Sequence, residues 1–196
     1  RMGFAFTRTY RSGVERASPL GYGWDANVYA RLEGQPNGDM LYCPGNGRSD
    51  RYQKQPGGGY TAPSGLYAKL MTNAPGHVLR FPDGLTYGFD PFGRITYCQD
   101  RIGNELVYQY PDTNQPLSKL IDEFGREINF SYSPARLLTN VTDFTGRAYV
   151  YSYDGNSNLV AVCSPVVVGT PNTNDFPAGK TEQYVYDTAN PDPRLA

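Results

Sequence analysis

A short repeated pattern is the feature that most restricts how this chain can fold. Residues 125–154 contain two copies, each opened by a glycine and an arginine. Large apolar or aromatic residues follow three, five and seven places after each glycine: Ile128, Phe130 and Tyr132 in the first copy, and Tyr149, Tyr151 and Tyr153 in the second. This period of two predicts a β-strand with one buried face in each copy.

Tight turns that begin with aspartate are expected to join these strands. Asp143, with Gly146 three places later, is typical of a type I turn closed by a left-handed residue, a conformation that glycine adopts easily. The same turn is expected at Asp90, Asp100 and Asp122. The aspartates at 100, 122 and 143 are 22 and 21 residues apart. A period this constant predicts an array of stacked hairpins.

The pattern departs from its own rule in three places. Ser133 stands where an aspartate would follow Tyr132, and Ser164 stands where the next turn aspartate is due. An insertion at residues 166–178 follows Ser164, and the pattern then resumes at Gly179. These departures affect the local geometry of the turns.

These residues resemble a known family. The pairs Tyr153-Asp154 and Tyr186-Asp187, together with the Asp-x-x-Gly-Arg turns, look like the YD repeats of the RHS (rearrangement hotspot) family. Residues 6–12 and 19–24 resemble the segment that opens the repeat region in bacterial members. The resemblance covers roughly residues 4–195. It implies that the repeats spiral into a hollow shell, which in polymorphic toxins of this family encloses a C-terminal effector.

The predicted fold is all-β, with repeated antiparallel hairpins forming a curled, continuous sheet that is part of a YD-repeat β-shell. Sheet twist accumulates with one hand, so a long array of hairpins is expected to wind. Residues 1–76 are expected to form an irregular β segment that opens the repeat region, and residues 77–196 the hairpin array. Leu195 falls in the middle of a returning strand, so the chain is expected to be incomplete at its C-terminus and part of a longer polypeptide.

Within the first segment, short strands are expected at residues 4–10, 39–42 and 51–54. Residues 65–73 could form a strand or a helix, and the strand is favoured.

Composition narrows the classes of function. A formal charge of −1 and a single histidine give no clustered basic surface for nucleic acid. No apolar run is long enough to span a membrane, and no signal peptide opens the chain. Three widely separated cysteines, Cys43, Cys98 and Cys163, do not suggest a disulfide framework.

A search for catalytic or metal-binding residues gives no strong candidate, so the chain is expected not to be an enzyme and to need no cofactor or metal. His77 is the only histidine, and no nucleophile elbow is present. A pair of catalytic carboxylates stays open as an alternative, although the turn aspartates already have a structural role. Residues 154–158 resemble half of a calcium loop, but Leu159 occupies the position that requires glycine, which favours a hairpin loop.

Aromatic side chains provide the weak candidates for binding: Tyr149, Tyr151, Tyr153 and Trp24. Stacked aromatic faces can bind sugars, although aligned tyrosines on neighbouring strands also stabilise a sheet by cross-strand contacts. The leading hypothesis is a non-catalytic segment of a shell that encloses a C-terminal effector, in an exported bacterial protein that is secreted or held at the cell surface. Its partner would be the rest of its own chain, meaning further repeats and the effector. The alternative is a cell-surface adhesion or carbohydrate-binding module.

Overall fold

The computed structural model describes residues 3–12, 17–187 and 194–195. The chain divides into two compact units. Unit 1 comprises Arg1–Thr9 and Asp25–Arg126, and unit 2 comprises Tyr10–Trp24 and Glu127–Ala196. Strands β1 (Arg8–Tyr10) and β4 (Trp24–Ala26) each run from one unit into the other along the chain.

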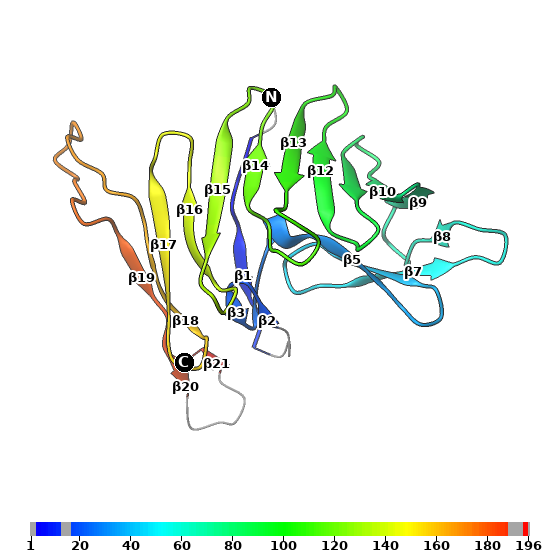
Figure 1. Ribbon diagram of the computed structural model, residues 1–196, viewed down its shortest axis with the longest axis horizontal. Helices are drawn as coiled ribbons and strands as arrows, with labels where there is room; N and C mark the ends of the chain where they lie inside the picture. Colours follow the sequence, from blue (N-terminus) through cyan, green and yellow to red (C-terminus); the bar gives the residue numbers. More distant parts are fainter. Residues whose placement is uncertain (1–2, 13–16, 188–193, 196) are drawn as a thin grey trace. The chain divides into compact units, whose positions relative to one another are not determined.

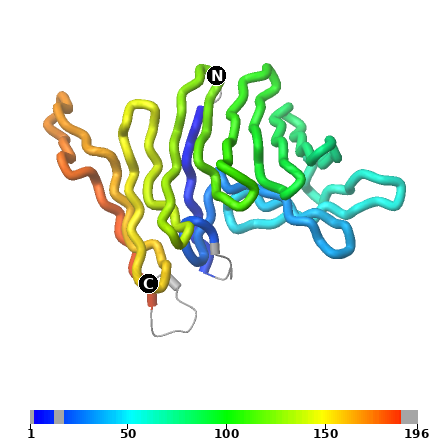
Figure 2. Tube along the Cα trace, viewed as in Figure 1, coloured from blue at the N-terminus to red at the C-terminus, as the bar shows by residue number. Residues whose placement is uncertain are grey.

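The fold is all-β and antiparallel, as the repeated pattern predicts. In the described part of the chain, the only helix is the three-residue 3₁₀ helix η1 (Asn27–Tyr29), and every strand pair of known register is antiparallel. Figure 1 shows the hairpins as successive arrows. The trace in Figure 2 follows the same order by colour.

Unit 1 contains two runs of strands, and neighbours in sequence pair with each other in both. The first run orders its strands β5, β6, β7, β8, and the second runs from β9 to β14. Their bounds are β5 (Arg31–Gly34), β6 (Met40–Cys43), β7 (Asp50–Lys54), β8 (Tyr60–Thr61), β9 (Lys69–Asn73), β10 (Gly76–Arg80), β11 (Thr86–Phe89), β12 (Ile95–Gln99), β13 (Glu105–Gln109) and β14 (Lys119–Ile121).

The core of unit 1 draws side chains from both runs. Residues that are nearly or completely buried form one cluster: Ala30, Leu32, Tyr42, Tyr52, Ala68, Leu70, Leu79, Phe89 and Ile95. Apolar burial of this kind stabilises a fold by about 25 cal/mol per Å² removed from water. Along β10 and β12, two partly buried residues separate the two buried ones.

Unit 2 contains the two copies that define the repeat. Its main sheet has consecutive, hydrogen-bonded strands: β15 (Glu127–Tyr132), β16 (Leu138–Thr142), β17 (Ala148–Tyr153), β18 (Leu159–Cys163) and β19 (Thr181–Gln183). Unit 2 also contains two small, separate hairpins: β2 (Ala17–Ser18) with β3 (Gly21–Tyr22), and β20 (Tyr186–Asp187) with β21 (Arg194–Leu195).

The strand predictions for the N-terminal segment need one correction, and one open alternative is decided. The strand expected at residues 4–10 is shorter and spans only Arg8–Tyr10. Residues 65–73 contain no helix: β9 begins at Lys69 and pairs with β10 along its whole length, which agrees with the favoured strand. Pairing with β10 settles the ambiguity between the helical and the strand pattern, because tertiary context overrides weak local preference.

Candidate functional site

Each turn aspartate forms a closed set of hydrogen bonds within five residues. Asp143 Oδ1 accepts the backbone N–H of Thr145 at 2.9 Å and that of Arg147 at 3.1 Å, and Oδ2 accepts Arg147 Nε at 2.9 Å. The Gly146 N–H donates to the Asp143 carbonyl at 2.9 Å, and Gly146 has φ of 83°. The turns that begin at residues 90, 100, 122 and 154 repeat this arrangement. The predicted turns are therefore confirmed.

These bonds favour the ionised form of the carboxylates of Asp100, Asp122 and Asp143. Desolvation would raise the pKa of Asp143, but hydrogen bonds from Thr145 and Arg147 outweigh it and lower that pKa to about 2. The pKa of Asp122 is also lowered, because hydrogen bonds from Arg126 and Phe124 outweigh the opposing desolvation. A side-chain hydrogen bond from Asn104 lowers the pKa of Asp100. The turn aspartates are therefore engaged as acceptors and are poorly suited to act as general acids at neutral pH.

Ser164 takes over the backbone role of the missing aspartate. Its Oγ accepts the Lys180 N–H at 2.8 Å, and its own N–H donates to the Lys180 carbonyl at 2.8 Å, as Asp143 and Arg147 do in the preceding turn. The insertion at 166–178 therefore lies inside a turn whose two ends are retained. Within it, Val167 and Phe176 form an isolated antiparallel bridge.

A tyrosine that precedes a turn donates a hydrogen bond from its hydroxyl to a backbone carbonyl of the previous hairpin. The Tyr110 hydroxyl donates to the Ile95 carbonyl at 3.0 Å in unit 1. In unit 2, the Tyr153 hydroxyl donates to the Leu138 carbonyl at 2.8 Å, and that of Tyr186 donates to the Leu159 carbonyl at 2.7 Å. Ile95, Leu138 and Leu159 are each at most 1% exposed. The hydroxyl therefore supplies a donor to a carbonyl that water cannot readily reach.

A β-bulge accompanies the residue before the turn. The strand register shifts between Ser152 and Tyr153, and again between Ser131 and Tyr132. The corresponding shift in unit 1 lies between Gly88 and Phe89. A bulge bends the strand and redirects the side chain beside it. The sequence pattern did not reveal this feature, because an extra residue in one strand leaves the spacing of the turns unchanged.

Trp24 lies in the interior of unit 2. It is 6% exposed, and its indole N–H donates to the Tyr186 hydroxyl at 2.8 Å. Its ring centroid is 5.3 Å from that of Tyr10 and 4.8 Å from that of Tyr184. Aromatic pairs at such distances contribute about 0.5–1.5 kcal/mol beyond area burial. In this chain the indole therefore packs against protein groups and does not offer an open face to a sugar.

The three tyrosines of β17 differ in their exposure. Tyr151 is 5% exposed, whereas Tyr149 is 46% exposed. Tyr153 is half-buried, and its hydroxyl is also 3.3 Å from the Pro19 carbonyl oxygen. The structure therefore does not place these tyrosines and Trp24 on one open stacking surface. Of the four candidate residues, Tyr149 alone presents a large exposed ring.

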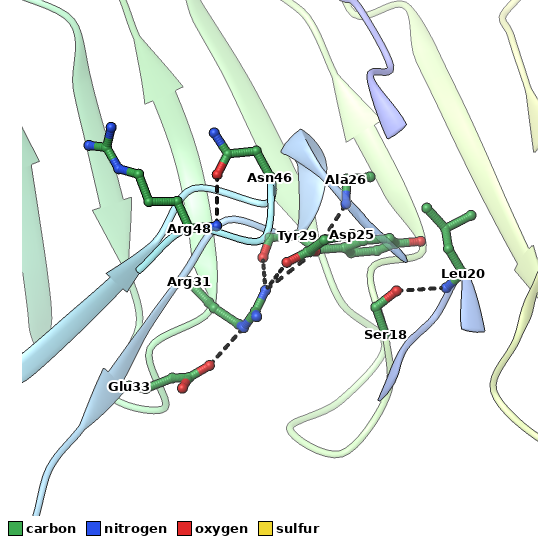
Figure 3. Close-up of polar contacts among 9 residues, drawn as sticks. All are labelled: Ser18, Leu20, Asp25, Ala26, Tyr29, Arg31, Glu33, Asn46 and Arg48. Atoms are coloured by element: carbon green, nitrogen blue, oxygen red, sulfur yellow. Dashed lines mark hydrogen bonds and ion pairs between the residues drawn. The ribbon is translucent and has the colours of Figure 1, made fainter. Parts of the chain in front are cut away.

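A buried ion pair at the start of unit 1 was not anticipated from the sequence. Asp25 is 5% exposed, and its Oδ2 is 3.1 Å from Arg31 Nη1 (Figure 3). Arg31 also donates through Nη1 to the Tyr29 carbonyl at 3.0 Å and through Nε to Glu33 Oε1 at 2.8 Å (Figure 3). Such a fully paired cluster fixes the path of the chain rather than offering a free charge to a ligand.

Burial shifts the pKa of two further candidate groups for chemistry, His77 and Cys98. Burial lowers the pKa of His77, with a further contribution from Lys54, and Nε2 lies 3.4 Å from the Tyr60 hydroxyl. Burial raises the pKa of Cys98 to about 12, so its thiol is protonated at neutral pH. Within the described residues, no group of three or more His, Cys, Asp or Glu side chains could hold a metal ion.

No helix in the part of the chain that the structure describes is long and apolar enough to cross a membrane.

A comparison with known protein families matches the N-terminal quarter of the chain. Residues 1–52 match a family described as "Domain of unknown function (DUF6531)". This match runs from β1 into β7 and includes Trp24 and the Asp25–Arg31 ion pair, whereas the Trp24 partners Tyr184 and Tyr186 lie outside it.

Curated relatives extend the similarity into the repeats. The chain is 28% identical over 178 residues to the tRNA(Glu)-specific nuclease WapA of Bacillus subtilis subsp. natto, covering 81% of this chain and 8% of that protein. It is also 28% identical over 114 residues to the tRNA nuclease WapA of Bacillus subtilis strain 168 and to the tRNA3(Ser)-specific nuclease WapA of Bacillus spizizenii, covering 58% of this chain and 5% of each relative. The chain thus spans less than a tenth of the length of these relatives.

Proposed function

We propose that this chain is a non-catalytic structural segment of an RHS/YD-repeat β-shell that encloses a C-terminal effector in a polymorphic toxin. The observation that carries the proposal is the recurring bond from a tyrosine hydroxyl to a buried carbonyl of the preceding hairpin. It occurs at Tyr110, Tyr153 and Tyr186. Each of these bonds joins a hairpin to the one before it and engages the tyrosine hydroxyl in holding the array together.

The charges in the turns support the same role. Arg94 and Arg147 each pair with the aspartate of their own turn, at 2.7 Å in both cases. Because these cations are neutralised locally, the hairpin ends offer little net charge for recognising an acidic partner. A structural shell can be built from turns whose polar groups bond to one another. A catalytic or binding loop usually leaves polar groups free for its substrate.

The relatives support a larger toxin around this segment. Their names assign nuclease activity to whole proteins of which this chain matches less than a tenth. We infer that any effector activity of the parent protein lies outside these residues. On the same reasoning, the protein is bacterial and exported, and it acts at the cell surface or after secretion.

Limited proteolysis of the full-length protein tests the enclosure. The C-terminal effector should be cleaved at least tenfold more slowly within the full-length protein than as an isolated domain. Replacing both Tyr110 and Tyr153 by phenylalanine should shorten this protection, whereas Tyr149→Phe should leave it unchanged. An effector that is digested equally fast with and without the repeats would refute the proposal.

A sugar titration separates the shell from a carbohydrate-binding module. Trp24 fluorescence is expected to stay constant as glycans are added, because its indole is buried and hydrogen bonded. Saturable glycan binding that Tyr149→Ala abolishes would instead favour the adhesion module.

A further inference from the structure

Unit 1 contains a pocket of about 310 Å³ that the shell role does not require. It lies between residues of η1 and strands β6, β11, β12 and β13. Its wall is mostly apolar and aromatic, and includes Val28, Leu106, Tyr42, Tyr87, Tyr108 and Cys98. Ligand sites in proteins commonly have volumes of about 300–1,000 Å³ and linings of this kind.

Two phenol groups, those of Tyr42 and Tyr108, line the pocket. Tyr42 is 4% exposed and Tyr108 is half-buried, and neither hydroxyl is hydrogen bonded to a described residue. Among the described residues, neither hydroxyl oxygen belongs to the buried polar atoms that lack a partner, so both are accessible and can donate a hydrogen bond to a molecule in the pocket.

The electrostatics of the pocket restrict its ligand. None of the lining residues is Asp, Glu, Lys, Arg or His. Burial raises the pKa of Tyr87 to about 12, and the pKa of Tyr42 and of Tyr108 rises in the same direction for the same reason. The lining is therefore uncharged at neutral pH, and a charged ligand would lose its hydration without gaining a counter-charge.

We propose that this pocket is a binding site for a small, neutral, largely apolar molecule that carries one hydrogen-bond acceptor. The aromatic and aliphatic wall would contact the body of the ligand, and the Tyr42 hydroxyl would donate to its acceptor. The volume suits a molecule of about one aromatic ring with a short substituent.

Three matched probes test the chemistry of the site in the intact chain. Acetophenone is neutral and has a carbonyl acceptor, ethylbenzene lacks the acceptor, and benzoate adds a negative charge. Titrations followed by ligand-observed NMR should show saturable binding of acetophenone, weaker binding of ethylbenzene and no binding of benzoate. Benzoate binding as tight as that of acetophenone, or no saturable binding of any probe at millimolar concentration, would overturn the proposal.

Two variants locate the hydrogen bond. Tyr42→Phe should weaken acetophenone binding by about 3- to 10-fold, the value of one neutral hydrogen bond, and change ethylbenzene binding less than twofold. Tyr67→Phe is the matched control, because Tyr67 is 80% exposed and does not line the pocket. Equal affinities of the two variants for acetophenone would contradict the assignment.

A measurement on the unmodified chain removes any doubt from misfolding. Cys98 lines the pocket, whereas Cys163 does not. Saturating acetophenone should shift the backbone amide NMR signals of the lining residues Cys98 and Leu106 and leave that of Cys163 unchanged. Unchanged Cys98 and Leu106 signals would place the probe elsewhere and refute the site.

Discussion

Gly93 and Gly125 occupy the same place in two nearly identical turns, yet substitution by alanine should affect them very differently. Both follow the pattern Asp-x-Phe-Gly-Arg, and their φ values are 80° and 73°. In each turn the arginine lies over the phenylalanine ring, at 5.7 Å in the first and 5.4 Å in the second. Forcing alanine into this left-handed conformation costs about 1–2 kcal/mol in either turn.

The surroundings of the two glycines differ. A Cβ at Gly125 would meet no atom within 4 Å, whereas a Cβ at Gly93 would overlap the Leu32 carbonyl oxygen. The Gly93 carbonyl also accepts the Leu32 N–H at 2.8 Å, and Leu32 is 3% exposed in the core of unit 1. Losing that bond adds about 0.5–1.5 kcal/mol, and displacing a packed segment adds about 1–3 kcal/mol. Gly93→Ala should therefore destabilise by about 3–6 kcal/mol, against about 1–2 kcal/mol for Gly125→Ala.

Urea unfolding followed by circular dichroism measures the free energy of unfolding of the two variants. Amide hydrogen exchange then tests whether the difference between them comes from the Leu32 contact. The Leu32 amide should exchange faster in Gly93→Ala and at the wild-type rate in Gly125→Ala when both are compared under native conditions. Equal losses of stability, within about 0.5 kcal/mol, would show that the Leu32 contact does not contribute and would refute the reasoning.

Three further predictions concern unit 2. Gly146→Val should destabilise by more than about 1 kcal/mol in urea unfolding, because a β-branched residue is strained at positive φ; wild-type stability would remove the turn assignment. Tyr153→Phe should cost about 1–2 kcal/mol in thermal or urea unfolding, because the buried Leu138 carbonyl loses a donor, whereas Tyr149→Phe should change stability by less than about 0.5 kcal/mol. For Asp143, the folded pKa of about 2 lies below the ordinary 3.8, so its stabilisation is present above pH 4 and lost as the pH falls towards 2. The stability difference between wild type and Asp143→Asn should shrink over that range, and a constant difference from pH 6 to pH 2 would contradict the assignment.

The turns could be predicted from the sequence because their determinants are local. Asp143 and Gly146 lie three residues apart, and every hydrogen bond of the turn closes within five residues. The same locality explains the correct assignment of the loop at residues 154–158 as a hairpin loop, where Asp154 bonds Asn156 and Asn158.

The role of the tyrosines could not be predicted from spacing. Tyr149, Tyr151 and Tyr153 share one period of two, yet the first is exposed and the second is buried. Their difference depends on what covers each part of the strand, and covering segments come from distant parts of the sequence. The Leu138 N–H, for example, bonds the Pro19 carbonyl at 2.6 Å, a contact across more than a hundred residues that no local pattern encodes.

The partners of Trp24 could not be predicted for the same reason. Its partner Tyr186 is 162 residues away in the chain. A signal was nevertheless present, since a lone tryptophan among glycines is a large apolar group that needs a partner.

The loop at residues 166–178 is a suitable site for inserting a foreign peptide, because the turn that begins at Ser164 keeps both of its ends. The bonds from Ser164 to Lys180 close the hairpin without help from residues 166–178, which are largely exposed. Because loop-closure entropy grows only slowly with length, an epitope or a fluorophore-acceptor peptide inserted there should leave the pairing of β18 with β19 unchanged. Such a graft would report on the assembled parent protein from a fixed point on unit 2.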